Sequence, residues 1–106
     1  MANIYKQRLL QQPGVAKIEL PYNNLNEVKN NILSVSAQYG EVPTVWYMDY
    51  GTDTNEFLVV CLPTRVDVCD ESITAENYIG TAQVSDGFLV LHYFIVEASE
   101  KENSIQ

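Results

Sequence analysis

The chain has 106 residues, of which 46% are hydrophobic and 19% are charged. This composition predicts one ordered domain with a modest core and excludes a disordered chain. Fourteen carboxylates against six cations give a formal net charge of −8, which leaves too few cations for the basic surface that binding to a nucleic-acid polymer requires. No hydrophobic run approaches the roughly 20 residues that cross a bilayer, and the N-terminus carries no signal pattern. We therefore expect a cytosolic protein with no membrane contact.

Hydrophobic runs at intervals of about ten residues predict about seven short strands. Pro13-Gly14 predicts a turn after the first run, and Pro21 ends the second. The fourth and fifth runs flank a polar loop at residues 51–55, and we expect them to form a hairpin with each other. The predicted strands are residues 4–10, 15–20, 32–39, 44–50, 56–62, 78–84 and 88–96.

The last two of these strands are expected to form the central hairpin of the fold. Asp86-Gly87 stands between them, and Asp-Gly between two apolar runs is the strongest short hairpin signal. The second run is apolar on both faces, which predicts a strand in the middle of a sheet rather than at its edge. One face carries Phe88, Val90, His92, Phe94 and Val96, and the other carries Leu89, Leu91, Tyr93 and Ile95.

The segment 22–31 is rich in asparagine and predicts a loop with no more than one helical turn. Asn24 is placed to cap that turn, with Glu27 three residues on as its capping-box partner. In the run that follows, Leu33, Val35, Ala37 and Tyr39 alternate toward the core.

Together these elements predict a mainly β fold, α+β at most. We expect a small antiparallel β-sandwich or open barrel of about seven short strands with at most one short helix. Residues 1–97 are predicted to form a single globular β-rich domain, and residues 98–106 a polar, flexible C-terminal tail.

The two cysteines and the single histidine match no common catalytic or metal-binding spacing. Cys61 lies in an apolar run, which is typical of a small core residue, whereas Cys69 lies in an acidic loop that weakens a thiol nucleophile. We expect both to be free thiols. A nucleophile–base pair of Cys61 and His92 requires their strands to adjoin, and no local motif supports it. The sequence therefore predicts no metal, no cofactor and no enzymatic activity.

Aromatic residues and a few isolated cations form the candidate binding set. The aromatic residues either pack within the sheets or stack against nucleobases; they are Trp46, Tyr47, Tyr50 and Tyr78, with Tyr93 as a further candidate. His92 is either a core-edge histidine bonded to a backbone carbonyl or a ligand contact.

Arg65 is the only cation between Lys29 and Lys101. Its fork and the Thr64 hydroxyl are suited to hold a phosphate; the alternative is a surface arginine paired with Asp67 or Asp70. Lys6 and Arg8, two apart on one strand face, offer a second positive spot. A small dianionic ligand needs only one or two such groups per phosphate.

The order of several segments is informative: IELP at 18–21, ILSVSAQ at 32–38, PTVW at 43–46, YIGTAQ at 78–83 and GFLVLHYF at 87–94. This order resembles a widespread family of small phage proteins, most of them uncharacterised, over roughly residues 4–97. The Tyr-Ile-Gly-Thr-x-Gln element and the His-x-Phe ending are its most specific parts. Many relatives carry a Gly-Thr-Gly loop where this chain has Leu62-Pro63-Thr64-Arg65, and Trp where it has Leu91.

That family is similar in size and pattern to phage sponge proteins, which sequester the cyclic nucleotide messengers of anti-phage systems such as CBASS. The resemblance implies a phage anti-defence protein that binds a cyclic di- or trinucleotide without cleaving it. It would act in the host bacterial cytoplasm as a homo-oligomer, with a dimer interface enclosing the ligand. A second hypothesis is an acidic inhibitor of a host defence protein, such as an anti-CRISPR or a host-takeover factor. An enzyme such as a phosphodiesterase comes last.

Overall fold

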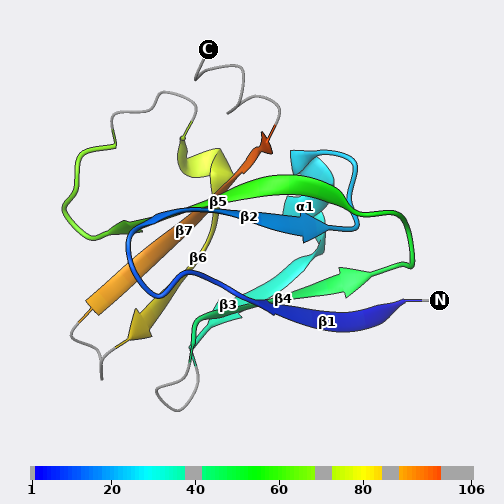
Figure 1. Ribbon diagram of the computed structural model, residues 1–106, viewed down its shortest axis with the longest axis horizontal. Coiled ribbons are helices and arrows are strands. Elements are labelled where there is room, and N and C mark those ends of the chain that lie inside the picture. The colour runs from blue at the N-terminus through cyan, green and yellow to red at the C-terminus, as the bar shows by residue number, and fades with distance from the viewer. Residues whose placement is uncertain (1, 38–41, 69–72, 85–88, 99–106) are drawn as a thin grey trace.

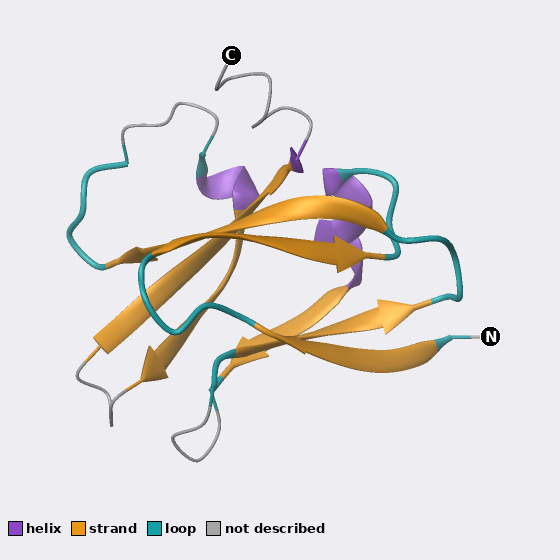
Figure 2. Ribbon diagram, viewed as in Figure 1, coloured by secondary structure: helices purple, strands orange, loops and turns teal. Residues whose placement is uncertain are grey.

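Two antiparallel sheets packed on one core form the structure. The computed structural model describes residues 2–37, 42–68, 73–84 and 89–98. Within this part of the chain, one sheet has the strand order β1-β4-β3 and the other has the order β2-β5-β7-β6 (Figure 1). The prediction of a small, mainly β fold is confirmed (Figure 2). The elements are β1 Asn3–Arg8, β2 Gly14–Leu20, α1 Leu25–Asn31, β3 Ile32–Ser36, β4 Thr44–Asp49, β5 Asn55–Pro63, the short 3₁₀ helix η1 Ala75–Asn77, β6 Tyr78–Val84 and β7 Leu89–Glu97.

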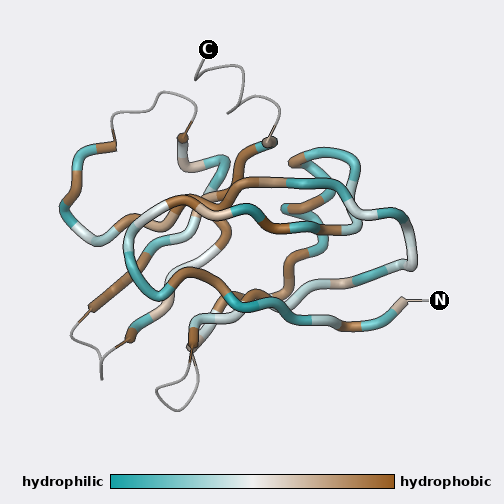
Figure 3. The backbone as a smooth tube through the Cα atoms, viewed as in Figure 1, coloured by the Kyte–Doolittle hydropathy of each residue, from teal (hydrophilic) through white to brown (hydrophobic). Residues whose placement is uncertain are grey.

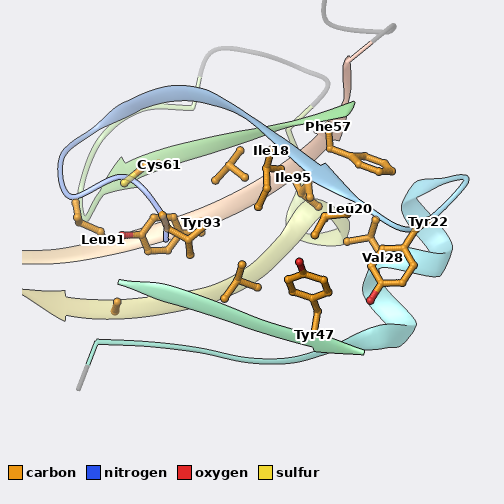
Figure 4. Packing of buried hydrophobic residues seen from close by; sticks show 14 residues of the cluster. Ile18, Leu20, Tyr22, Val28, Tyr47, Phe57, Cys61, Leu91, Tyr93 and Ile95 are labelled. Atoms are coloured by element: carbon orange, nitrogen blue, oxygen red, sulfur yellow. The ribbon is translucent and has the colours of Figure 1, made fainter. Parts of the chain in front are cut away.

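The core lies between the two sheets. Tyr47 of β4 points into it from one side, and Ile18 and Ile95 point into it from the other (Figure 4). Because side chains alternate along a strand, the residues between these inward ones point to the opposite surface of their sheet. The molecule therefore has two outer faces, one per sheet, turned away from each other. This division decides which candidate site residues can meet.

β7 is the most hydrophobic strand and lies inside its sheet, as predicted, between β5 and β6 (Figure 3). Leu91, Tyr93 and Ile95 are completely buried in the main core. On its outer face Val96 packs with Leu58 and Ala98 in a second, smaller cluster. β6 pairs with β7 starting at Val84 and Leu89, which confirms the hairpin strands. The predicted turn at Asp86-Gly87, and Phe88 after it, lie outside the described residues, as does Cys69.

The predicted hairpin between the fourth and fifth strands is wrong. β4 is the middle strand of its sheet, with β1 and β3 on its two edges, so β5 has no edge of β4 to join. The segment between them instead carries the chain to the other sheet. Asp49 accepts a hydrogen bond from the Gly51 amide at 2.7 Å, and the Thr52 hydroxyl donates to the Pro21 carbonyl at 2.9 Å. These contacts fix a crossing between sheets, where the sequence pattern indicated a simple reversal.

The helix is longer than predicted, because α1 spans seven residues. The cap is confirmed: the Asn24 side chain accepts from the Glu27 amide at 2.9 Å. Burial of Val28 outweighs the poor helix propensity of the asparagines. Asn31 also donates its side-chain amide to the Glu27 carbonyl at 2.7 Å, so it supports the last turn.

Two irregularities bring β3 and β6 into contact. A register shift between Ile32 and Ser34 turns Leu33 outward, where it is 52% exposed, so its predicted inward position is wrong. A second shift lies in β6, between Tyr78 and Gly80. A Cβ added at Gly80 would lie 2.4 Å from the Cβ of Val35. We call this contact between β3 and β6 the closed seam.

The opposite side, where β1 and β2 face each other, is more open. The Gln7 side-chain amide crosses it, donating to the Glu19 carbonyl at 2.7 Å and to the Tyr47 hydroxyl at 2.9 Å. Among the strands of the described residues, neither has a second neighbour in its sheet. We call this gap the open seam. As for the predicted tail, Ala98 is buried, and residues 99–106 lie outside the described part.

Candidate functional site

A chain of four hydrogen-bonded side chains crosses the outer face of the four-stranded sheet. The Thr64 hydroxyl lies 2.7 Å from Nε2 of His92, and the Thr81 hydroxyl lies 3.0 Å from its Nδ1. The hydroxyl of Thr81 is in turn 2.5 Å from that of Tyr78. The chain therefore connects the end of β5, the middle of β7 and the start of β6. We call it the relay.

Strand pairing explains why these residues meet. His92 points outward because its neighbours Leu91 and Tyr93 point into the core. Thr81 is its direct partner on β6, so their side chains lie on the same face. Tyr78 is three residues from Thr81 and would face the core in a regular strand. The register shift between Tyr78 and Gly80 turns it outward.

The relay can rearrange its hydrogen bonds around a ligand. Each hydroxyl can both donate and accept a hydrogen bond, so both ring nitrogens of His92 stay partnered whichever one carries a proton. At the β6 end, Tyr78 is 43% exposed, and its ring packs edge-to-face on Phe94 with 5.8 Å between ring centroids. The surface thus combines an exposed aromatic ring with a line of adaptable polar groups.

Arg65 follows the relay's first residue and has an unusual backbone. Its φ of 69° is in the left-handed region, and it is the only non-glycine residue with a positive φ in the described ranges. That conformation costs a non-glycine residue on the order of 1 kcal/mol. Asp70, one of the two expected ion-pair partners of Arg65, lies outside these ranges.

The remaining candidates lie elsewhere. Lys6 and Trp46 are cross-strand partners on the outer face of the three-stranded sheet, with the ammonium 5.1 Å from the ring centroid. Arg8 is two residues along β1 from Lys6 and pairs with Thr44. Tyr47 is a core residue, and Tyr50 is exposed just after β4. The structure thus links Thr64, His92 and Tyr78 through Thr81, with Arg65 next to Thr64 in the sequence. It places Lys6, Arg8 and Trp46 on the opposite face.

The sequence interpretation missed Thr81. A two-residue turn at Asp86-Gly87 sets a hairpin register that places Thr81 opposite His92, the pairing observed in the structure. Applying that register would have identified the Thr81–His92 pair. The register shift that turns Tyr78 outward has no comparable signal in the sequence.

The buried thiol is not part of this surface. Cys61 points into the core, while His92 is on the outer face of the neighbouring strand, so the two do not form a nucleophile–base pair. Burial raises the pKa of the Cys61 thiol, and a hydrogen bond with Tyr93 only partly opposes this. Across the described ranges, no three His, Cys, Asp or Glu side chains are grouped as a metal site would require. No helix in those ranges has the length and hydrophobicity of a membrane span.

Comparison of the chain with models of protein families, with curated proteins and with solved structures finds no match. The resemblance to small phage proteins therefore stays a prediction.

Proposed function

We propose that this protein is a phage anti-defence protein that binds and sequesters a cyclic di- or trinucleotide on the outer face of its four-stranded sheet, without cleaving it. The observation that carries the proposal is the relay, flanked by Arg65 at one end and by the exposed Tyr78 ring at the other. Such a ligand has the two chemical features that this surface matches, a flat base and an anionic phosphate.

In this proposal, the cationic and aromatic side chains contact different parts of the ligand. The Arg65 fork is suited to a phosphate oxygen pair, with the Thr64 hydroxyl beside it as a further donor. At the other end, a base can stack on the exposed part of Tyr78, which Phe94 supports from its edge. His92 and Thr81, between these ends, can exchange one of their mutual hydrogen bonds for a bond to the ligand. The protein's net charge of −8 does not prevent this, because a small ligand needs only these local donors.

The hollow beside Tyr78 is too small to enclose a nucleotide. The hollow beside Tyr78, lined also by Lys29, Ile32 and Ile79, has a volume of only about 90 Å³. Ligand pockets usually measure about 300–1,000 Å³. We therefore propose that two copies of the chain bind the ligand between them, in the host cytoplasm where such messengers are made.

The test is a titration of the purified protein with a panel of cyclic di- and trinucleotides, followed by tryptophan fluorescence and melting temperature. Denaturing the complex must release the ligand intact. Arg65→Ala is expected to weaken binding by about 1–3 kcal/mol, and His92→Phe should weaken it as well.

The matched controls are Lys6→Ala and Trp46→Phe, which alter the opposite face. Because Trp46 is the only tryptophan of the chain, binding to Trp46→Phe is followed by melting temperature alone. Equal affinity in these controls and the wild type supports the relay as the site. Loss of binding only in the controls would keep the function but move the site to the three-stranded sheet. If no ligand binds at all, the proposal is wrong.

A second candidate function is inhibition of a host protein. β1 is an edge strand, and Ile4 and Tyr5 on it are 62% and 51% exposed. Exposed apolar residues on a free edge favour pairing with a strand of a partner. Recovery of one stoichiometric host protein, lost when Ile4 and Tyr5 are replaced by serine, would support this function.

A further inference from the structure

β1 is an edge strand of the three-stranded sheet. It lies at one end of the order β1-β4-β3, and among the described strands none pairs with it on the side of the open seam (Figure 1). All of its residues except Gln7 are exposed. Such an edge presents a row of backbone donors and acceptors with which a strand of another chain can pair.

One backbone hydrogen bond shows which residues hold these groups. The Leu9 amide donates to the Pro43 carbonyl at 2.8 Å, which continues the pairing of β1 with β4. Along a strand, successive residues direct their N–H and C=O groups to opposite sides. Since Leu9 bonds toward β4, the residues that direct these groups to the free edge are Ile4, Lys6 and Arg8.

The side chains of the same three residues lie on the outer face of the three-stranded sheet. Lys6 is opposite Trp46, and its ammonium lies 5.1 Å from the centroid of that ring. Trp46 points outward because the next residue of β4, Tyr47, is in the core. Side chains alternate along a strand, so Ile4 and Arg8 share the face of Lys6.

This face is positively charged on an otherwise acidic protein. Its positions on β1 and β4 are Ile4, Lys6, Arg8, Thr44, Trp46 and Met48. These six include two cations and no carboxylate, although the chain has 14 carboxylates and only six cations. The two cations stand two residues apart along the free edge. Their charge therefore complements an acidic partner.

We propose that the free edge of β1 binds an extended acidic segment of a partner protein as an additional antiparallel strand. The described strand pairs of this fold are all antiparallel, and this pairing is slightly more stable per residue than the parallel one. Side chains directly opposite each other lie on the same face. The segment would thus carry a carboxylate opposite Arg8, a second one two residues later opposite Lys6, and an apolar side chain two residues further on opposite Ile4.

A second copy of the chain does not suit this edge. In the antiparallel register that pairs the three edge residues with one another, Lys6 would lie opposite its own counterpart and Ile4 opposite the arginine. Like charges directly opposite each other destabilise a strand pair. An acidic segment replaces this repulsion by two favourable charge pairs.

The inference rests on the second candidate function and specifies its partner, because both use the edge of β1. It does not depend on nucleotide binding, which is proposed for the outer face of the other sheet. The test uses purified protein and synthetic peptides. Failure to recover a host protein and failure of the edge to bind an acidic strand are therefore separate results.

The probe is the end-blocked peptide Thr-Glu-Thr-Glu-Val-Val-Thr, and the comparison peptide has glutamine in place of both glutamates. Because of the two charge pairs, isothermal titration should give binding of the glutamate peptide about fivefold tighter. The double variant Lys6→Gln, Arg8→Gln should bind the two peptides equally. The matched control is Lys17→Gln, Lys29→Gln, which removes an equal charge from exposed positions on other elements and should preserve the preference.

Amide hydrogen exchange of the wild type tests the pairing itself. The glutamate peptide should slow exchange at Ile4, Lys6 and Arg8 and leave Tyr5 and Gln7, which bond toward β4, unchanged. This readout decides the question even if the double variant does not fold. Equal affinity of the two peptides for the wild type would overturn the proposal. So would unchanged exchange at the three edge amides, or a preference that persists in a folded double variant.

Discussion

Replacing Gly80 by alanine should destabilise the protein through one contact. The alanine Cβ would lie 2.4 Å from Cβ of Val35 and 2.7 Å from its Cγ2, whereas carbon atoms in contact are about 3.5–4.0 Å apart. The φ of Gly80 is not in the left-handed region, so the obstacle is the neighbouring side chain rather than the backbone conformation. Rotation of Val35 cannot remove the contact, since its Cβ is fixed to the backbone of β3.

The magnitude follows from two opposing effects. Overpacking of this kind costs about 1–3 kcal/mol, because β3 and β6 must separate by roughly an ångström. Replacing glycine by alanine also restricts the unfolded chain, which restores about 0.4–1 kcal/mol. We expect a net loss of about 1–2 kcal/mol in the free energy of unfolding. For a domain of this size that corresponds to a fall in melting temperature of roughly 4–10 °C.

Urea unfolding of a double-mutant cycle measures this effect. Val35→Gly removes the three atoms nearest to the added Cβ, so the double variant Gly80→Ala, Val35→Gly should lose at least about 1 kcal/mol less than the sum of the two single variants. Gly51→Ala is the control. Gly51 has a φ of 80° and open space around it, so its cost comes from the backbone and should not change with Val35. A stable Gly80→Ala variant, or strict additivity in the cycle, would refute the steric argument.

Three further predictions concern single side chains. Burial raises the pKa of Tyr22 to about 12, so the protonated phenol favours the folded state. This stability is complete below pH 10 and is lost as the pH rises toward 12. The melting temperature of Tyr22→Phe should accordingly fall less between pH 10 and pH 12 than that of the wild type. Cys61, fully buried and with a raised pKa, should not react with a thiol reagent at pH 8 in a Cys69→Ser variant until denaturant is added, and rapid labelling of the folded protein would contradict its placement. Arg65→Gly should increase the free energy of unfolding by about 0.5–1 kcal/mol, because glycine accepts a φ of 69° without strain, while weakening nucleotide binding; a stabilised variant with unchanged affinity would remove Arg65 from the site.

The sequence predicted the local elements well and the assignment of strands to sheets less well. Alternation identified the inward residues Ile18 and Leu20 of β2, and the Asp-Gly signal identified the β6–β7 hairpin. The separation of β4 from β5 could not be predicted, because a short polar loop is compatible with both a hairpin and a crossing between sheets. The outcome depends on which strands occupy the edges of β4, and these are distant in sequence.

The candidate site was predicted only in part, because its geometry also depends on the pairing of strands that are distant in sequence. Thr64, Tyr78 and His92 were selected for their chemistry, and the structure places them in one chain of hydrogen bonds. Trp46 and Lys6 were selected on the same grounds but lie on the other outer face. Residue type indicates what a side chain can bind, whereas the face on which it lies depends on register, and a single shift such as that at Leu33 changes it.

The register shift in β6 connects the fold to the candidate site. It places Gly80 against Val35, which closes the seam between the sheets, and it also turns Tyr78 to the outer face, where its hydroxyl meets Thr81. Both effects come from one irregularity within the Tyr-Ile-Gly-Thr segment. A substitution that forces β6 away from β3 must therefore also move Tyr78 relative to His92. Closure of the fold and the geometry of the relay thus depend on the same residues, and this gives the Tyr-Ile-Gly-Thr segment a physical role that side-chain chemistry alone does not explain.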